Sequence, residues 1–357
     1  MSVVMKREIY EIERYITDNI IIDVNYVEEF TNKHGEIKEL KAFYIYSLYK
    51  TNQIKTANDA LLTLNISEDF EKNSFFLMVK SLVQLSNETD IDQLIKMLES
   101  YLVVDNQRNN KWLRLELFKL YEKKEIDYLA WGYLEDAISI DENFYEAILL
   151  RAQRLDLITN CSDIINQLLQ LPQSYVDSDI LNFLGNAFLN CNEIDNAIKI
   201  FNGSLEIGIT EEAYYFIGYI NHYHLNNYEE AMFYYDKSIS TNNQFVDVLL
   251  EKAWLFFDMN LYESSETLFK EIVGSHDEIN SYNQITLFYL KTRKYIEVVN
   301  YIEKSKIRFG ENYMNQGFEL VYLEKIKEDS YVKKYHLYKE KYSQNELTWF
   351  RDLLAEL

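Results

Sequence analysis

The chain has 357 residues, of which 48% are hydrophobic and 15% aromatic, and this is too apolar a composition for a disordered protein. Its formal net charge of −22 repels phosphate backbones, so nucleic-acid binding is disfavoured. One proline and nine glycines provide few breaks for strands and tight turns. The composition therefore favours long helices joined by short polar turns.

Two features bear on where the protein works. Cys161 and Cys191 are the only cysteines and lack the spacing of a metal or redox motif, so we expect two reduced, half-buried thiols. Each falls near the turn between the two helices of neighbouring repeats, so the pair could approach one another. The first 15 residues carry charges throughout and no apolar core of a signal peptide, and no apolar run is long enough to cross a membrane. We therefore expect a cytoplasmic protein.

Apolar residues at helical spacing predict helices over Met5–Asn19 and Asn25–Asn32. This opening segment lacks the repeat described below, and we interpret residues 1–37 as an N-terminal helical cap.

From residue 38 a four-position pattern begins and continues in weak form to residue 177. A small or apolar residue is followed about a dozen positions later by another, then by a large apolar residue and a final apolar one. The four weak copies are Ile45, Ala57, Leu61, Leu64; Leu82, Leu94, Leu98, Tyr101; Phe118, Ala130, Leu134, Ala137; and Ala152, Ile164, Leu168, Leu171.

Residues 178–312 carry the same pattern more clearly. Successive copies start near Ser178, Glu211, Val246 and Ile279, a period of about 34 residues. The copies are Gly185, Ala197, Phe201, Ser204; Gly218, Ala231, Tyr235, Ser238; Ala253, Ser265, Phe269, Ile272; and Thr286, Val298, Ile302, Ser305. The pattern resembles the tetratricopeptide repeat. That resemblance implies an all-α, right-handed solenoid of helix hairpins, whose first helices line a concave groove that binds peptides or partner segments.

Beyond Asn312 the pattern fades. Helices are predicted over Tyr313–Ile326, Ser330–Lys341 and Gln344–Leu357, the last with Ser343 and Glu346 as a capping pair. We interpret residues 313–357 as a C-terminal helical cap.

Helix geometry predicts which residues of the clear repeats face the groove, because they lie on the stripe opposite the small residues. Two sets share a chemistry. Asn182, Asn186 and Asn190 form a ladder of amides suited to a peptide backbone, although ordinary solvent-facing side chains would look the same. Aromatic side chains form a wall of the kind that dominates binding hot spots, although such a stripe also suits the core between repeats. The predicted partner-binding residues are Asn182, Phe183, Asn186, Asn190, Tyr215, Phe216, Tyr219, His222, Tyr223, Glu251, Trp254, Phe257, Asp258, Asn283 and Gln284, with Leu287 beside them.

Catalytic and cofactor motifs are absent from the sequence, which contains no phosphate-binding glycine loop, Gly-x-Ser-x-Gly or His-Glu-x-x-His. His222 and His224 fall on different faces of one helix, so we expect no metal site. Co-chaperone members of the resembling family hold a terminal carboxylate with lysine and arginine. The matching positions here are Asn182, Asn186, Tyr215, Phe216 and Glu251, so that activity is not expected.

The sequence thus predicts a non-enzymatic scaffold without a cofactor, acting as an adaptor, assembly factor or co-chaperone. Glu251 and Asp258 favour a basic or amphipathic protein partner, and neither nucleic acid nor membrane is expected. Two alternatives remain open. The first is an acidic inhibitor or immunity-type protein that blocks a basic partner with its outer surface, and the second is a peptide-sensing regulator. The pattern does not predict an oligomeric state.

Overall fold

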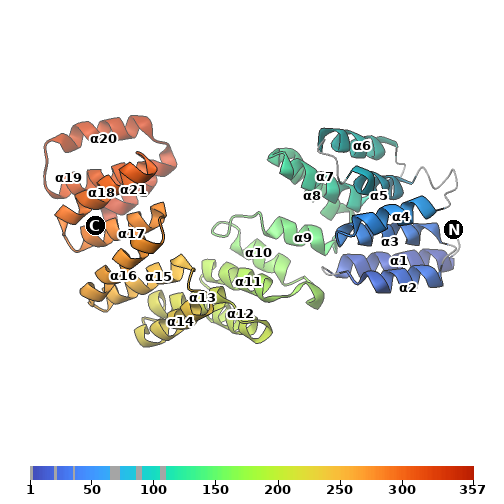
Figure 1. The fold of residues 1–357 in the computed structure, drawn as a ribbon, viewed down its shortest axis with the longest axis horizontal. Helices are drawn as coiled ribbons and strands as arrows, with labels where there is room; N and C mark the ends of the chain where they lie inside the picture. The colour runs from blue at the N-terminus through green and yellow to red at the C-terminus, as the bar shows by residue number, and fades with distance from the viewer. Residues whose placement is uncertain (1–2, 20–21, 35–36, 65–72, 86–90, 105–109) are drawn as a thin grey trace. The chain divides into compact units, whose positions relative to one another are not determined.

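The computed structural model describes residues 3–19, 22–34, 37–64, 73–85, 91–104 and 110–357, and in these residues every regular element is helical (Figure 1). The all-α fold class is therefore confirmed. Two compact units divide the chain, Met1–Ile200 and Phe201–Leu357, and the boundary falls inside one helix. The predicted division into two caps and two groups of repeats stays a prediction.

The first unit contains α1 to α11 and one short 3₁₀ helix, and α12 crosses the boundary. Their bounds are α1 Val3–Asp18, α2 Val24–Lys33, α3 Lys38–Lys50, α4 Ile54–Thr63, α5 Ser74–Leu85, α6 Ile91–Val104, α7 Lys111–Lys123, α8 Asp127–Ile140, α9 Tyr145–Ala152, α10 Cys161–Leu168, the 3₁₀ helix Gln173–Tyr175, α11 Ser178–Asn190 and α12 Ile194–Ile207.

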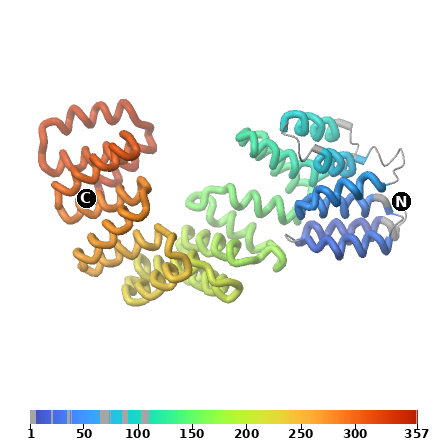
Figure 2. Tube along the Cα trace, in the orientation of Figure 1, coloured from blue at the N-terminus to red at the C-terminus, as the bar shows by residue number. Residues whose placement is uncertain are grey.

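The second unit continues the same antiparallel pairing, which Figure 2 traces along the backbone. Its helices are α13 Glu211–Tyr223, α14 Tyr228–Thr241, α15 Val246–Asp258, α16 Tyr262–Ser275, α17 Ile279–Lys291, α18 Tyr295–Phe309, α19 Tyr313–Lys325, α20 Ser330–Lys341 and α21 Gln344–Glu356. The predicted helices at both ends of the chain agree with these bounds to within two residues.

The repeat positions are the packing positions. Ala197, Ala231 and Ala253 have no exposed surface, and the same holds for the large side chains of Phe201, Tyr235 and Phe269. Two helices approach closely only where the residues at their crossing are small or interdigitate. Gly218 on α13 is such a small residue, because a Cβ there would meet the ring of Tyr235 on α14. The predicted register is confirmed.

A left-handed turn residue recurs in the turns of successive hairpins from α11 to α20. Asn192, Asn226, Asn260, Arg293 and Lys327 all have φ between 52° and 62°. One such residue lets a later backbone N–H satisfy a carbonyl left free at the end of the preceding helix, as a Schellman turn does. The series reaches Lys327, so α19 and α20 form one further hairpin of this kind even though the small-residue pattern has faded there.

In the first unit, helices from different hairpins are joined by charged side chains that are at least partly buried. Lys119 on α7 bonds both Glu116, 3.1 Å away, and Glu146 on α9, 2.9 Å away. Lys50 on α3 also donates to Glu146, and the Tyr46 hydroxyl donates to Glu116 at 2.9 Å. The first helices of the first, third and fourth hairpins of the repeat are therefore linked through their side chains.

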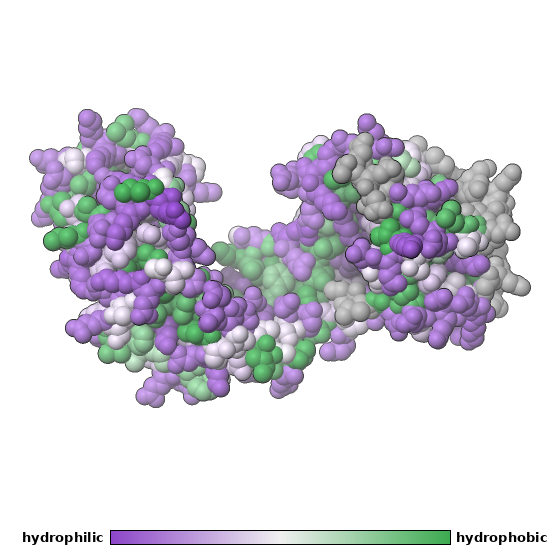
Figure 3. Space-filling model, viewed as in Figure 1, coloured by the Kyte–Doolittle hydropathy of each residue, from purple (hydrophilic) through white to green (hydrophobic). Residues whose placement is uncertain are grey.

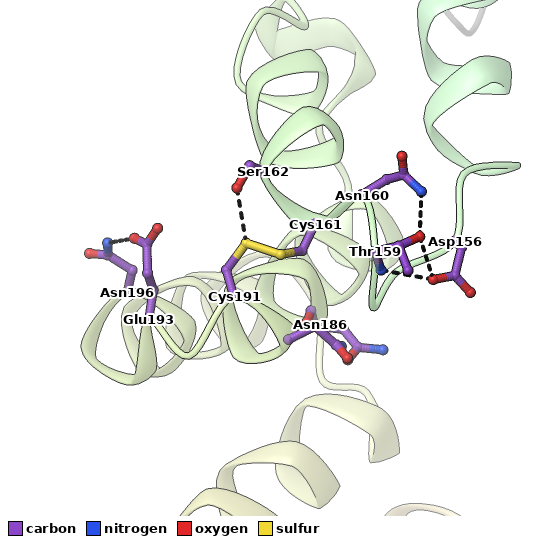
Figure 4. The surroundings of a disulfide bond; sticks show 10 residues. Asp156, Thr159, Asn160, Cys161, Ser162, Asn186, Cys191, Glu193 and Asn196 are labelled. Carbon is purple, nitrogen blue, oxygen red and sulfur yellow. Dashed lines mark hydrogen bonds between the residues drawn. A yellow bond between two sulfur atoms is a disulfide. The ribbon is translucent and has the colours of Figure 1, made fainter. Parts of the chain in front are cut away.

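The expectation of reduced cysteines is wrong, because Cys161 and Cys191 form a disulfide (Figure 4). Cys161 begins α10 and Cys191 follows the last residue of α11, and these two helices pack together. Their Cα atoms are 5.7 Å apart, within the range that a disulfide spans. Spacing along the sequence cannot show this pairing, which depends on how neighbouring hairpins stack.

Candidate protein-binding surface

The candidate site is the face formed by the first helix of each hairpin, here called the first-helix face. Four of the predicted residues lie on α11 in the first unit, and eleven lie on α13, α15 and α17 in the second unit. We describe each unit by itself.

The amides of α11 are less open to a ligand than the sequence predicts. Asn182 is only 3% exposed. The side-chain NH₂ of Asn190 donates to the backbone carbonyl and the side-chain oxygen of Asn186, both at 2.9 Å. One amide is therefore buried and the other two bond to each other, while Phe183 beside them is partly exposed.

A stripe of tyrosines runs along α13. Tyr215, Tyr219 and Tyr223 are four residues apart, so they lie on one side of the helix. Their ring centroids are 6.3 Å and 4.7 Å apart in turn. Tyr215 also contacts Phe216 and Phe245, and each of the three rings of the stripe keeps some exposed surface. The stripe is therefore both an inter-helix contact and part of the surface.

A carboxylate on α15 lies against this stripe. The hydroxyl of Tyr223 donates to Oε2 of Glu251 at 2.6 Å. Burial raises the pKa of Glu251, and the nearby charges of Asp247 and Asp258 raise it further, against the opposing effect of the Tyr223 hydrogen bond. No Lys or Arg in the described part of the chain forms an ion pair with Glu251. A half-buried carboxylate beside aromatic rings is a suitable receptor for a cation.

His222 does not face a ligand, because only 1% of its surface is exposed. Its Nε2 lies 2.9 Å from Oδ2 of Asp258, and its Nδ1 lies 3.4 Å from the hydroxyl of Tyr235. Burial lowers the pKa of His222 more than Asp258 raises it, so the imidazole is neutral near pH 7. His222 therefore positions Asp258, which is itself exposed at the end of α15.

Trp254 links α15 to α17. Its indole Nε1–H donates to Oε1 of Gln284 at 2.9 Å, and its ring packs edge-on against Phe257 and Phe269. Asn283 is 7% exposed and donates to Sδ of Met314 on α19. The face thus continues from α13 through α15 and α17 to α19.

The sequence analysis missed a cleft at the end of this face. It has a volume of about 210 Å³ and lies between α17, α19 and α21. Its lining residues are Asn280, Asn283, Gln284, Leu287, Met314, Phe318, Trp349, Asp352 and Leu353. Gly317 was the available signal, because a Cβ there would lie 2.6 Å from the ring of Trp349, and a small residue in mid-helix marks a close approach.

The family model for the tetratricopeptide repeat matches residues 211–245, which form the hairpin of α13 and α14. That match identifies one copy of the 34-residue pattern as a tetratricopeptide repeat. This chain contains a tetratricopeptide repeat. No curated protein matches its sequence significantly.

Solved structures resemble this chain in fold. Yeast Tom70 is 12% identical with a TM-score of 0.54, and the match covers 93% of this chain and 85% of that one. The C-terminal part of a repeat protein from Cytophaga hutchinsonii is 17% identical over 68% of this chain and 99% of that one, with a TM-score of 0.48. A tetratricopeptide repeat protein from Parabacteroides merdae is 16% identical over 79% and 98% of the two chains, with a TM-score of 0.46.

Stacked helix hairpins present extended surfaces that bind other proteins. None of the described helices is both long enough and apolar enough to cross a bilayer. On the side of the molecule drawn in Figure 3, hydrophilic side chains cover most of the surface of each unit and hydrophobic ones lie in scattered patches.

Proposed function

We propose that the first-helix face of the second unit binds a basic or amphipathic segment of a partner protein, and that the chain acts as an adaptor, assembly factor or co-chaperone. The observation that carries the proposal is Glu251, a half-buried carboxylate that has tyrosines around it and no cationic partner in the described residues. A lysine or arginine side chain of the partner would meet both the carboxylate and the faces of the Tyr219 and Tyr223 rings.

The raised pKa of Glu251 supports a role other than stability. A folded-state pKa above the usual 4.5 means that the folded protein holds the proton more tightly than the unfolded chain does. Stability therefore falls as the pH rises from about 4.5 through the folded-state pKa, and it stays lower at neutral pH. A charge that destabilises the fold, yet lies at the surface, is typical of a binding site.

The test is binding of synthetic peptides to the wild type and to Glu251→Gln, measured by fluorescence anisotropy. We expect an arginine-containing peptide to lose about tenfold or more in affinity, because one charge-assisted hydrogen bond contributes about 1.5–3 kcal/mol. The Gln variant should unfold at a higher temperature at pH 7, so weaker binding would not reflect unfolding. Glu229→Gln, an exposed change of the same charge on α14, is the matched control.

The net charge of −22 favours a second candidate, in which the acidic exterior blocks a basic partner. If the acidic exterior binds the partner, Glu251→Gln and Glu229→Gln should weaken its affinity equally. The partner should also dissociate at moderate ionic strength. Equal affinities for the wild type and Glu251→Gln would refute the role of the face.

The cytoplasmic location stays a prediction, and the Cys161–Cys191 disulfide is the observation against it. Such bonds persist in oxidising compartments and are rare where glutathione and thioredoxin keep thiols reduced.

A further inference from the structure

The cleft between α17, α19 and α21 is built on an apolar floor. Phe318 and Leu353 are 3% and 6% exposed, and the Trp349 ring stands at 90° to that of Phe318, with centroids 5.6 Å apart. Trp349 reaches this position because Gly317 has no Cβ in its way. At about 210 Å³ the cleft is smaller than the usual 300–1,000 Å³ of small-molecule sites, and its size suits one large side chain.

The cleft is continuous with the first-helix face. Gln284 lines the cleft on α17 and accepts the indole N–H of Trp254 on α15. Glu251 lies on the same helix as Trp254, three residues earlier, so the two side chains share one side of α15. A segment crossing from Glu251 over Trp254 arrives at the cleft.

The charge at the cleft matches the charge at Glu251. Asp352 on α21 is exposed and is the only charged residue among those that line the cleft. In the part of the chain that the structure describes, it forms no ion pair with a Lys or Arg. The amides of Asn280, Asn283 and Gln284 are the other polar groups that line the cleft. An apolar side chain carried on a basic segment therefore fits the cleft, whereas an acidic segment would be repelled at both ends.

We infer that the cleft binds a bulky apolar side chain, of the size of leucine, methionine or phenylalanine, from the same partner segment whose basic side chain binds at Glu251. The inference rests on the proposed function and adds the partner's second anchor. Neighbouring helices lie about 8–10 Å apart, so the cleft is about 15 Å from α15. An extended chain spans about 3.3 Å per residue, which places the two anchors about four or five residues apart.

The experiment uses the full chain and synthetic peptides of serine and glycine that carry one arginine alone, or one arginine with one phenylalanine two, four, five or eight residues away. Anisotropy titrations give each dissociation constant. We expect the phenylalanine to strengthen binding at least tenfold at a separation of four or five and to have little effect at two or eight. If phenylalanine adds nothing at any separation while the arginine peptide binds, the inference is overturned and the proposed function stands. If no peptide binds, the proposed function fails with it.

Blocking the cleft provides the matched variant. Leu287→Trp fills the cleft from α17, and we expect it to remove the gain from phenylalanine. Leu225→Trp makes the same change at a side chain that is 51% exposed in the turn after α13 and should alter neither affinity. Asn280→Trp blocks the cleft from its exposed rim without entering the core, so the test survives if Leu287→Trp unfolds. A phenylalanine gain that persists in both blocking variants would place the apolar anchor elsewhere and refute the inference.

Discussion

Gly218→Ala tests the closest packing contact of the repeat. Gly218 lies on α13, and an ideal Cβ there would lie 2.6 Å and 2.7 Å from two ring carbons of Tyr235 on α14. Favourable carbon contacts are about 3.5–4.0 Å, so the ring has to move by about 1 Å. It has no free direction, because Tyr235 is fully buried beside Tyr215 and His222.

Two effects of opposite sign determine the magnitude. Alanine in a helix is favoured over glycine by up to about 1 kcal/mol. Overpacking a buried site costs about 1–3 kcal/mol. Gly274→Ala, in the last turn of α16, is the control, because a Cβ there meets nothing within 4 Å. The gain in helix propensity from glycine to alanine applies to both variants, so the difference between their free energies of unfolding reports the packing cost. Gly218→Ala should be the less stable variant by about 1–3 kcal/mol.

The assay is thermal unfolding of both variants and the wild type by circular dichroism. A difference of 1 kcal/mol shifts the midpoint by about 2–4 °C in a unit of this size. Because repeat arrays unfold in local steps, hydrogen exchange of the α13 and α14 amides should show the same order. If Gly218→Ala is as stable as Gly274→Ala, the contact between Gly218 and Tyr235 does not limit packing, and the repeat register loses its physical basis.

Two further predictions concern the first unit. The Cys161–Cys191 bond spans 30 residues of sequence, so its removal by reductant or by Cys161→Ser should lower stability by about 3–4 kcal/mol in unfolding experiments. The Ser variant should no longer respond to reductant, and alkylation of both cysteines in intact cells would show that the bond does not form there. Glu146→Gln leaves Lys50 and Lys119 without their shared carboxylate and should cost about 3–5 kcal/mol, whereas the exposed Glu142→Gln should cost little. Lys119 and Lys50 outweigh burial and lower the pKa of Glu146 to about 2, so its contribution is present above pH 4.5 and lost as the pH falls towards 2. An acid-unfolding curve for Glu146→Gln with the wild-type slope would contradict this assignment.

The sequence by itself determined the hairpins and their register. Gly218, Ala231 and Tyr235 recur at a spacing that only stacked helix pairs explain, and the structure buries all three. At the C-terminus, Ser343 and Glu346 were predicted as a capping pair, and the backbone N–H of Ser343 donates to the Glu346 carboxylate at 2.7 Å. These features can be predicted from the sequence because each depends on residues within one repeat length, where the rules of periodicity and helix capping apply.

Only the tertiary structure decided which side chains of the first-helix face are accessible. The stripe rule placed His222 and Asn182 on the surface, yet both are buried, because a stripe defines a direction on one helix and not what the next hairpin covers. The cleft beside Trp349, the disulfide and the bond from Lys50 to Glu146 were also invisible in the sequence. Lys50 and Glu146 are 96 residues apart, and their meeting depends on how several hairpins accumulate small rotations. The spacing of residues within one repeat does not reveal this accumulated rotation.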